Sequence, residues 1–219
     1  MEKFFSVLKN CELFRGIDEE SLSAMLKCLD ARVREFGKDE TIFHEGQEVK
    51  CIGIVLSGVV QVMQDDYFGY RSIWARIGTS GLFGEAFACA GTDFLPVNVT
   101  TVEDSKIMFI DCRRISNTCS NACGFHQQVI FNLLHALAAK NVMLRQKMEI
   151  TSKRTTREKL LAYLALQAKL HHSNTFTIPY DRQELANYLQ VDRSAMSAEI
   201  GRLRKEGLIQ CSRSRFTII

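Results

Sequence analysis

Proline and uninterrupted apolar runs are scarce in this chain. Only 2 of the 219 residues are proline, and 46% are hydrophobic, which excludes Pro-rich linkers, collagen-like repeats and long disorder. The most apolar stretch, residues 129–144, is broken by two asparagines, a histidine and a lysine, so it is not expected to cross a bilayer. The first residues contain an acid at position 2 and lack the apolar core of a signal peptide.

A secreted disulfide scaffold is also not indicated, because a chain of this length can bury a core without covalent cross-links. We therefore expect a cytoplasmic protein whose eight cysteines are mostly reduced and which has no membrane partner.

The charge is small overall but unevenly distributed. The chain has 28 basic and 25 acidic residues, a net charge of +3. Residues 151–219 carry 12 basic and 6 acidic side chains, a net of +6, whereas residues 1–150 carry 16 and 19, a net of −3. This asymmetry predicts a polyanion-binding module in the C-terminal part.

Short β-rich runs alternate with glycine-centred turns between Val33 and Cys112. The predicted strands cover residues 41–43, 51–56, 59–63, 71–77, 97–99 and 106–110. Several strands at this spacing are typical of a β-sandwich or barrel. A helix is predicted before them over residues 18–30, with Asp18 as its N-cap.

An apolar heptad pattern follows the strands. Its members, spaced by 4, 3, 4, 3 and 4 residues, are Ile130, Leu134, Leu137, Asn141, Leu144 and Met148. The pattern predicts the seam of a parallel two-stranded coiled coil, in which a single asparagine at an a position fixes the pairing. The alternative is a helix buried against its own β domain, with Asn141 near the rim.

The C-terminal part has the pattern of a helix-turn-helix. Asp181 and Glu184 have the spacing of a capping box, and Asp192 precedes a second helix over residues 193–205. Residues 207–219 predict a two-stranded wing with a basic tip. The alternative is a helical hairpin with a purely structural role.

The outer face of the second helix and the wing carry side chains that suit DNA. Arginine and serine side chains can reach base edges and phosphates, but burial in a hydrophobic core would not stabilise them. The inward face is predicted to be Val191, Met196, Ile200 and Leu203. The residues predicted to contact DNA are Arg193, Ser194, Ser197, Arg202, Gln183, Arg213 and Arg215.

Taken together, several segments resemble the Crp/Fnr family of bacterial transcription regulators. The resemblance covers nearly the whole chain, and it rests on the order and spacing of these segments. They are Leu13-Phe14-Arg15-Gly16-Ile17, Phe43-His44-Glu45-Gly46, Leu56-Ser57-Gly58-Val59-Val60, Phe83-Gly84-Glu85, residues 157–164 and residues 192–197. The resemblance implies an α+β fold with an N-terminal cyclic-nucleotide-binding-like β-roll, a long dimerisation helix and a C-terminal winged helix-turn-helix. The sensor domain would cover residues 1–149, with the dimerisation helix at about 125–149, and the DNA-binding domain residues 150–219.

The resemblance also implies a function. The chain would be a homodimeric, non-enzymatic transcription regulator whose DNA binding responds to an effector or redox signal at the β-roll and dimerisation helix. Its partners would be double-stranded DNA with a two-fold operator, a second copy of the chain and RNA polymerase. The alternative is a ligand-binding regulatory protein that acts through protein contacts, against which the basic wing argues.

The sequence departs from the cAMP-binding members at the effector pocket. Those members hold a ribose hydroxyl with a Gly-Glu pair, here Gly84-Glu85, and grip the phosphate with an Arg-Ser/Thr-Ala triplet ten residues later. This chain has Leu95-Pro96-Val97 at the triplet and Met143-Leu144 where an adenine-contacting Thr-Ser pair is expected. Because the charged phosphate partner is missing, cAMP is not the expected effector. The candidate effector pocket comprises Gly84, Glu85, Ala86, Leu95, Pro96 and Val97, with an unknown ligand.

The cysteines differ from those of Fnr-like members, which bind an iron–sulfur cluster through an N-terminal cysteine group. Only Cys11 precedes Cys28 here. A second group follows Cys112, in which Cys119, Cys123 and His126 would share one helix face. Thiolate and imidazole ligands suit zinc, an iron–sulfur cluster or haem. The alternative is buried structural cysteines, with His126 capping the helix.

Overall fold

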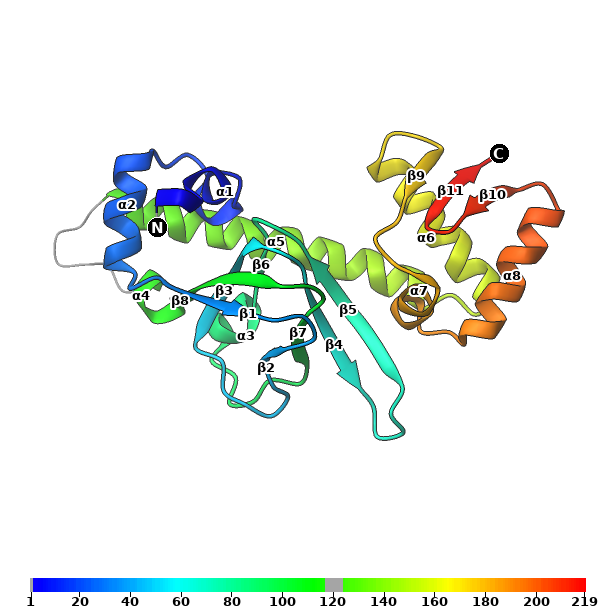
Figure 1. Cartoon of the computed structure of the whole chain (residues 1–219), viewed down its shortest axis with the longest axis horizontal. Coiled ribbons are helices and arrows are strands. Elements are labelled where there is room, and N and C mark those ends of the chain that lie inside the picture. Colours follow the sequence, from blue (N-terminus) through cyan, green and yellow to red (C-terminus); the bar gives the residue numbers. More distant parts are fainter. Residues whose placement is uncertain (1, 117–123) are drawn as a thin grey trace. The chain divides into compact units, whose positions relative to one another are not determined.

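The computed structural model describes residues 2–116 and 124–219, which form two compact units. The first unit comprises Met1–Tyr70 with Trp74–Asn141, and the second comprises Arg71–Ile73 with Val142–Ile219 (Figure 1). The long helix α5, Gly124–Thr151, contributes residues to both units. Within the described ranges, none of the helices combines the length and hydropathy needed to span a bilayer.

Helices open the first unit. They are the 3-10 turns η1 (Glu2–Phe4) and η2 (Glu12–Phe14), the short helix α1 (Phe5–Lys9) and α2 (Glu19–Cys28). Asp18 caps α2 by accepting a hydrogen bond from the Ser21 backbone N–H at 2.9 Å, as the sequence predicts. The buried face of α2, including Leu22 and Leu26, packs into a core that also contains part of α5.

Two four-stranded sheets form the β part of the first unit, except that the first three residues of one strand, Arg71–Ile73, belong to the second unit. Their strands are β1 (Arg32–Phe36), β2 (Thr41–Phe43), β3 (Cys51–Ser57), β4 (Val60–Asp65), β5 (Arg71–Ile77), β6 (Leu82–Phe83), β7 (Asn98–Thr101) and β8 (Ser105–Asp111). One sheet has the order β1-β8-β3-β6 and the other β2-β7-β4-β5 (Figure 1). All six predicted strands are confirmed. β1 and β6 were not predicted, because three of the five residues of β1 are charged and β6 has only two residues.

An aromatic cluster fills the space between these sheets. The rings of Phe43 and Phe83 lie 5.7 Å apart, and those of Phe43 and Phe109 lie 5.8 Å apart. Gly53 on β3 must remain small, because a Cβ there would lie 2.2 Å from the Phe83 ring. Two short helices complete the unit, α3 (Glu85–Ala90) and α4 (Cys112–Ser116), and α4 packs through Cys112 and Ile115 into the core that also holds α2.

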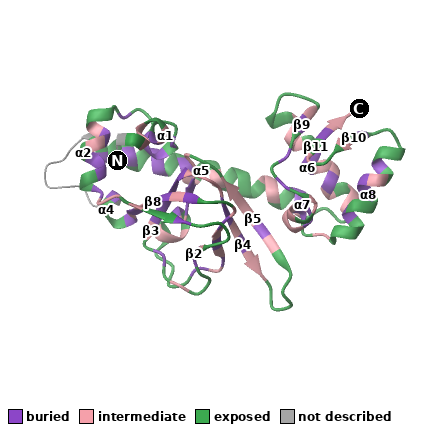
Figure 2. Cartoon of the chain, viewed as in Figure 1, coloured by how far each residue is buried: buried purple, intermediate pink, exposed green. Residues whose placement is uncertain are grey.

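Helix α5 buries one face and exposes another (Figure 2). Val129, Leu133 and Ala136 pack into the core of the first unit. On the same face, buried Asn132 donates hydrogen bonds to the carbonyls of Leu13 at 3.0 Å and Arg15 at 2.8 Å. The helix therefore does pack against its own domain, and of the predicted heptad seam only Leu137 takes part in that packing within the described ranges.

The second unit has helices, a small sheet and its own core. Its elements after α5 are α6 (Thr156–Leu170), β9 (Thr175–Thr177), α7 (Arg182–Leu189), α8 (Arg193–Lys205), β10 (Ile209–Ser212) and β11 (Arg215–Ile218). The sheet order is β10-β11-β9, so the wing has a third strand besides the two predicted for it. Leu160, Leu164, Leu185 and Phe216 are buried in this core.

Candidate nucleic-acid interface and effector region

Helices α7 and α8 form the predicted helix-turn-helix. Asp181 and Glu184 make a reciprocal capping box at the start of α7. Gln190 ends α7 with a φ of +54°, and the Asp192 side chain then caps α8 by accepting from the Ala195 N–H at 2.9 Å. These local signals end α7 and start α8 within three residues, which fixes where α8 begins.

The inward face of α8 matches the prediction. Met196 and Leu203 are fully buried and Ile200 is nearly so, whereas Val191 in the turn is half-buried against the same core. Because these residues hold α8 from one side, its opposite side is available to a ligand.

All seven residues predicted to contact DNA are exposed. Arg193, Ser194, Ser197 and Arg202 lie on α8, Gln183 on α7, and Arg213 and Arg215 at the turn between β10 and β11. Some have partners inside the protein: Ser194 donates to Asp192, Gln183 donates to Asn187, and Arg202 pairs with Glu199 at 3.1 Å. Arg193 and Ser197 therefore form the centre of the candidate interface, at the first turns of α8.

An ion-pair network that the sequence did not reveal fastens α8 to α6. Glu199 is buried on the inward side of α8 and pairs with Arg157 of α6 at 3.1 Å. Arg157 also contacts both carboxylate oxygens of Glu206, and this pairing lowers the pKa of the Glu206 carboxyl. The only sequence signal was an acidic residue on the apolar face of a helix, which is unusual unless the charge is paired.

The wing presents its basic tip on a tight turn. Ser212 and Arg215 pair across the β10–β11 hairpin, and Arg213 between them has a φ of +49°. Ser214 donates to the Tyr180 carbonyl at 3.1 Å, which ties the turn to the segment before α7. Both arginines of the tip are exposed, a placement that suits contact with a phosphate backbone.

The predicted effector residues divide into two groups. Gly84 and Glu85 lie where β6 meets α3, and Gly84 has a φ of +77°. A Cβ at Gly84 would lie 3.1 Å from the Phe43 ring and 3.3 Å from the Cys51 carbonyl oxygen, so glycine fits best here. Leu95 and Val97 are buried in the β core, Pro96 is half-buried and Ala86 is exposed.

Glu85 has a partner inside the protein. Its side chain is 4% exposed, and Oε1 accepts a hydrogen bond from Lys140 Nζ of α5 at 2.7 Å. The same ammonium group donates to the Leu82 carbonyl at 2.6 Å. The buried Oε2 atom of Glu85 makes no hydrogen bond within the described ranges. The carboxylate predicted to face an effector thus also links the β-roll to the long helix.

The predicted metal site lies mostly outside the described residues. Cys119 and Cys123 fall in the segment 117–123, and only His126, which is buried, and Cys112 can be located. In the part of the chain that the structure describes, no three His, Cys, Asp or Glu side chains are grouped as metal ligands would be.

Comparison with known proteins gives two family matches. Residues 33–122 match the cyclic nucleotide-binding domain, and residues 158–219 match the Crp-like helix-turn-helix domain. The chain is 23% identical to the transcriptional activator protein FnrL of Cereibacter sphaeroides, covering 85% of this chain and 75% of that protein. It is 22% identical to the transcriptional activator protein FnrA of Stutzerimonas stutzeri, covering 92% and 81%.

Solved structures share the fold. The c-di-GMP-responsive global regulator CLP of Xanthomonas campestris superposes with a TM-score of 0.74 at 14% identity, covering 92% of this chain and 99% of that one. FixK2 of Bradyrhizobium japonicum gives a TM-score of 0.66 at 17% identity, covering 86% and 92%.

Proposed function

Because the chain belongs to the Crp/Fnr family of transcription regulators, we propose that it binds a two-fold operator in double-stranded DNA as a homodimer. The observation that carries the proposal is the outer face of α8, where Arg193 and Ser197 are exposed at the first turns beside a basic wing. A helix held by its inner face and offering polar side chains outward can enter the major groove. We propose RNA polymerase as a further partner of the DNA-bound protein and the cytoplasm as its location.

The exposed side of α5 supports the dimer. Of the predicted seam, Leu134 and Met148 are more than 60% exposed and Leu144 is 51% exposed. Asn141 is also exposed, whereas Ile130 is 39% exposed and Leu137 is half-buried against its own domain. Large apolar side chains in a heptad row gain most from pairing with a second copy of the helix.

We propose that the effector is not cAMP. The residues at the phosphate-gripping position are apolar, and two of them, Leu95 and Val97, are part of the β core. The Glu85 carboxylate, which would hold the ribose, is already paired with Lys140. An effector or redox signal that changes this pair would act directly on α5. A metal or cluster at Cys119, Cys123 and His126 remains a separate proposal.

A salt-dependent gel shift tests the function. The purified full-length protein is expected to shift duplex DNA, with an affinity that falls steeply as salt rises, because bound phosphates release counterions. A protein that shifts no DNA at low salt, and instead captures a protein partner through residues 150–219, would favour the alternative of a regulator acting through protein contacts.

Arg193 is expected to read one base pair in each half-site. Arg193→Ala should lose about 1–3 kcal/mol of discrimination at that base pair, because an arginine can bond guanine O6 and N7 together. Selection of bound sequences from a random pool would show one position of the motif relaxed.

The wing arginines are the matched comparison for Arg193. Arg213→Ala and Arg215→Ala should weaken binding to all sequences alike and reduce the salt slope by about one unit per lost phosphate contact. If the Arg193 variant keeps the wild-type motif, or if the wing variants change it, the assignment of the two surfaces is wrong.

A further inference from the structure

Two cysteines from separate helices meet beside the effector region. The Sγ atoms of Cys89, near the end of α3, and Cys112, at the first position of α4, lie 2.9 Å apart. This distance is longer than a disulfide bond of about 2.05 Å, so a shift of about 0.9 Å would join the two sulfurs. It is shorter than the roughly 3.8 Å that separates two thiolates on a tetrahedral zinc with Zn–S bonds of about 2.3 Å.

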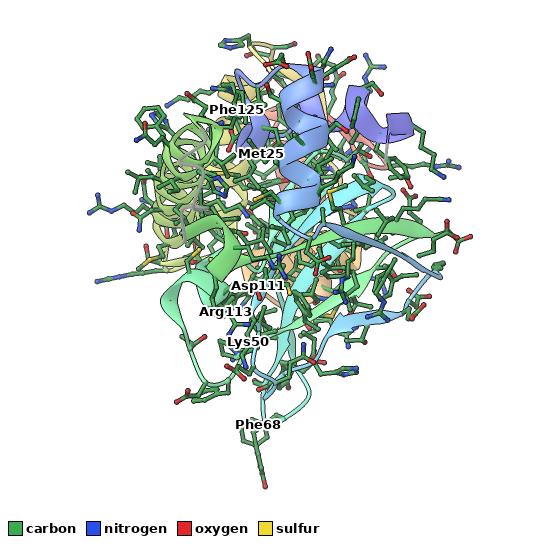
Figure 3. The ribbon with its side chains drawn as sticks, turned by 90° about the vertical axis from the view of Figure 1, so that its left-hand side faces the viewer. Met25, Lys50, Phe68, Asp111, Arg113 and Phe125 are labelled. Carbon is green, nitrogen blue, oxygen red and sulfur yellow. The ribbon has the colours of Figure 1, made fainter. Side chains whose placement is uncertain are left out.

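The two thiols differ in environment. Cys89 is exposed, whereas Cys112 is 7% exposed and its backbone N–H donates to the Lys50 carbonyl at 3.0 Å. Asp111 and Arg113 flank Cys112 and form an ion pair at 3.0 Å; Figure 3 labels both together with Lys50, whose carbonyl accepts from Cys112. The hydrogen bond between the thiols lowers the pKa of Cys112 and raises that of Cys89. The lowering at Cys112 outweighs burial and the neighbouring Asp111 carboxylate, which both raise its pKa, and Cys89 is the accessible second thiol.

We propose that Cys89 and Cys112 form a peroxide-sensitive dithiol, which closes into a reversible intramolecular disulfide. The Cys112 thiolate attacks one oxygen of hydrogen peroxide, which gives a sulfenic acid and hydroxide. The Cys89 sulfur then attacks the sulfenic sulfur, and its proton leaves with the hydroxyl group as water. In total, two thiols and one peroxide give one disulfide and two waters, so the two sulfurs lose two electrons to the peroxide oxygens.

The position of the pair links this chemistry to the proposed function, on which its regulatory consequence rests. Helix α3 begins with Glu85, whose carboxylate holds Lys140 of α5. Drawing the end of α3 toward α4 would displace this short helix and strain the Glu85–Lys140 contact. Oxidation should therefore change DNA affinity by about 5-fold or more, the lower end of typical coupling between two sites.

Trypsin separates the two cysteines, which makes the bond directly measurable. Cleavage after Arg76, Lys106 and Arg113 places Cys89 in peptide 77–106 and Cys112 in peptide 107–113, each with a single cysteine. After treatment of the reduced full-length protein with hydrogen peroxide and alkylation, mass spectrometry should find these peptides joined. Dithiothreitol should release them, Cys89→Ser should abolish the link, and Cys51→Ser, which removes another nearby thiol, should retain it.

The outcomes separate this proposal from the function on which it rests. Absence of the linked peptide at peroxide concentrations that oxidise the exposed Cys28 would overturn the proposal, as would stoichiometric zinc or iron that is lost in Cys89→Ser. A linked peptide with unchanged DNA affinity would overturn its regulatory consequence. Failure of the reduced protein to bind DNA would instead contradict the proposed function and leave the dithiol chemistry standing.

Discussion

Replacing Leu134 and Leu144 together with aspartate is expected to convert the dimer into a monomer at micromolar concentration. Both side chains are at least half exposed in the single chain and belong to the predicted heptad row. Buried aspartates in a helix pair would repel each other and would also lack hydrogen-bond partners. Since a monomer can contact only one half-site, its affinity for operator DNA should fall by about 100-fold or more.

Sedimentation and gel shift measure the two effects separately. The matched control is Leu170→Asp, which changes a leucine that is 60% exposed at the end of α6 and does not belong to the heptad row. It should leave both dimerisation and DNA binding intact. Asn141→Leu should keep the helices paired but loosen their register and oligomeric state. A double variant that sediments as a dimer, or a monomeric wild-type protein, would contradict the proposed seam.

Lys140→Met is expected to destabilise the first unit by about 3 kcal/mol. It removes the cation from Glu85, whose side chain is only 4% exposed, and leaves a buried carboxylate without compensation. We expect the lower end of the usual range for such a loss, because the Lys140 side chain itself is 34% exposed. Chemical denaturation followed by fluorescence of Trp74 would report the change, since this is the single tryptophan and belongs to the first unit.

Two further variants serve as controls for the stability loss expected of Lys140→Met. Lys106→Met removes the same kind of charge from a surface pair with Glu35, whose side chains are 39% and 71% exposed, and should cost less than about 1 kcal/mol. Combining Lys140→Met with Glu85→Gln should recover much of the stability, because the uncompensated charge is then gone. If Lys140→Met costs no more than Lys106→Met, the Glu85 pair does not stabilise the contact between the β-roll and α5.

The sequence was sufficient to predict those features of the fold that depend on residues only a few positions apart. The caps at Asp18, Asp181 and Asp192 predicted three helix starts, and short β-rich runs between glycine-centred turns predicted six strands. β1 was missed, because its only buried residue, Phe36, follows four residues that are exposed or half-buried and mostly charged. The apolar positions of α8 were also predicted from period alone.

Contacts between distant residues could not be predicted in this way. Glu85 and Lys140 are 55 positions apart, and Asn132 bonds to carbonyls more than 115 positions away. The heptad row was visible in the sequence, but the second face of α5 that packs on the domain was not. The meeting of Cys89 and Cys112 likewise depends on how α3 and α4 fold back, not on their spacing.

Selection of bound duplexes from a random pool by the full-length wild-type protein tests the central claim most directly. A homodimer with two recognition helices predicts an inverted repeat whose half-sites are centred about one helical turn apart, roughly 10 base pairs. Enrichment of an asymmetric single site, or of no sequence at all, would contradict the account.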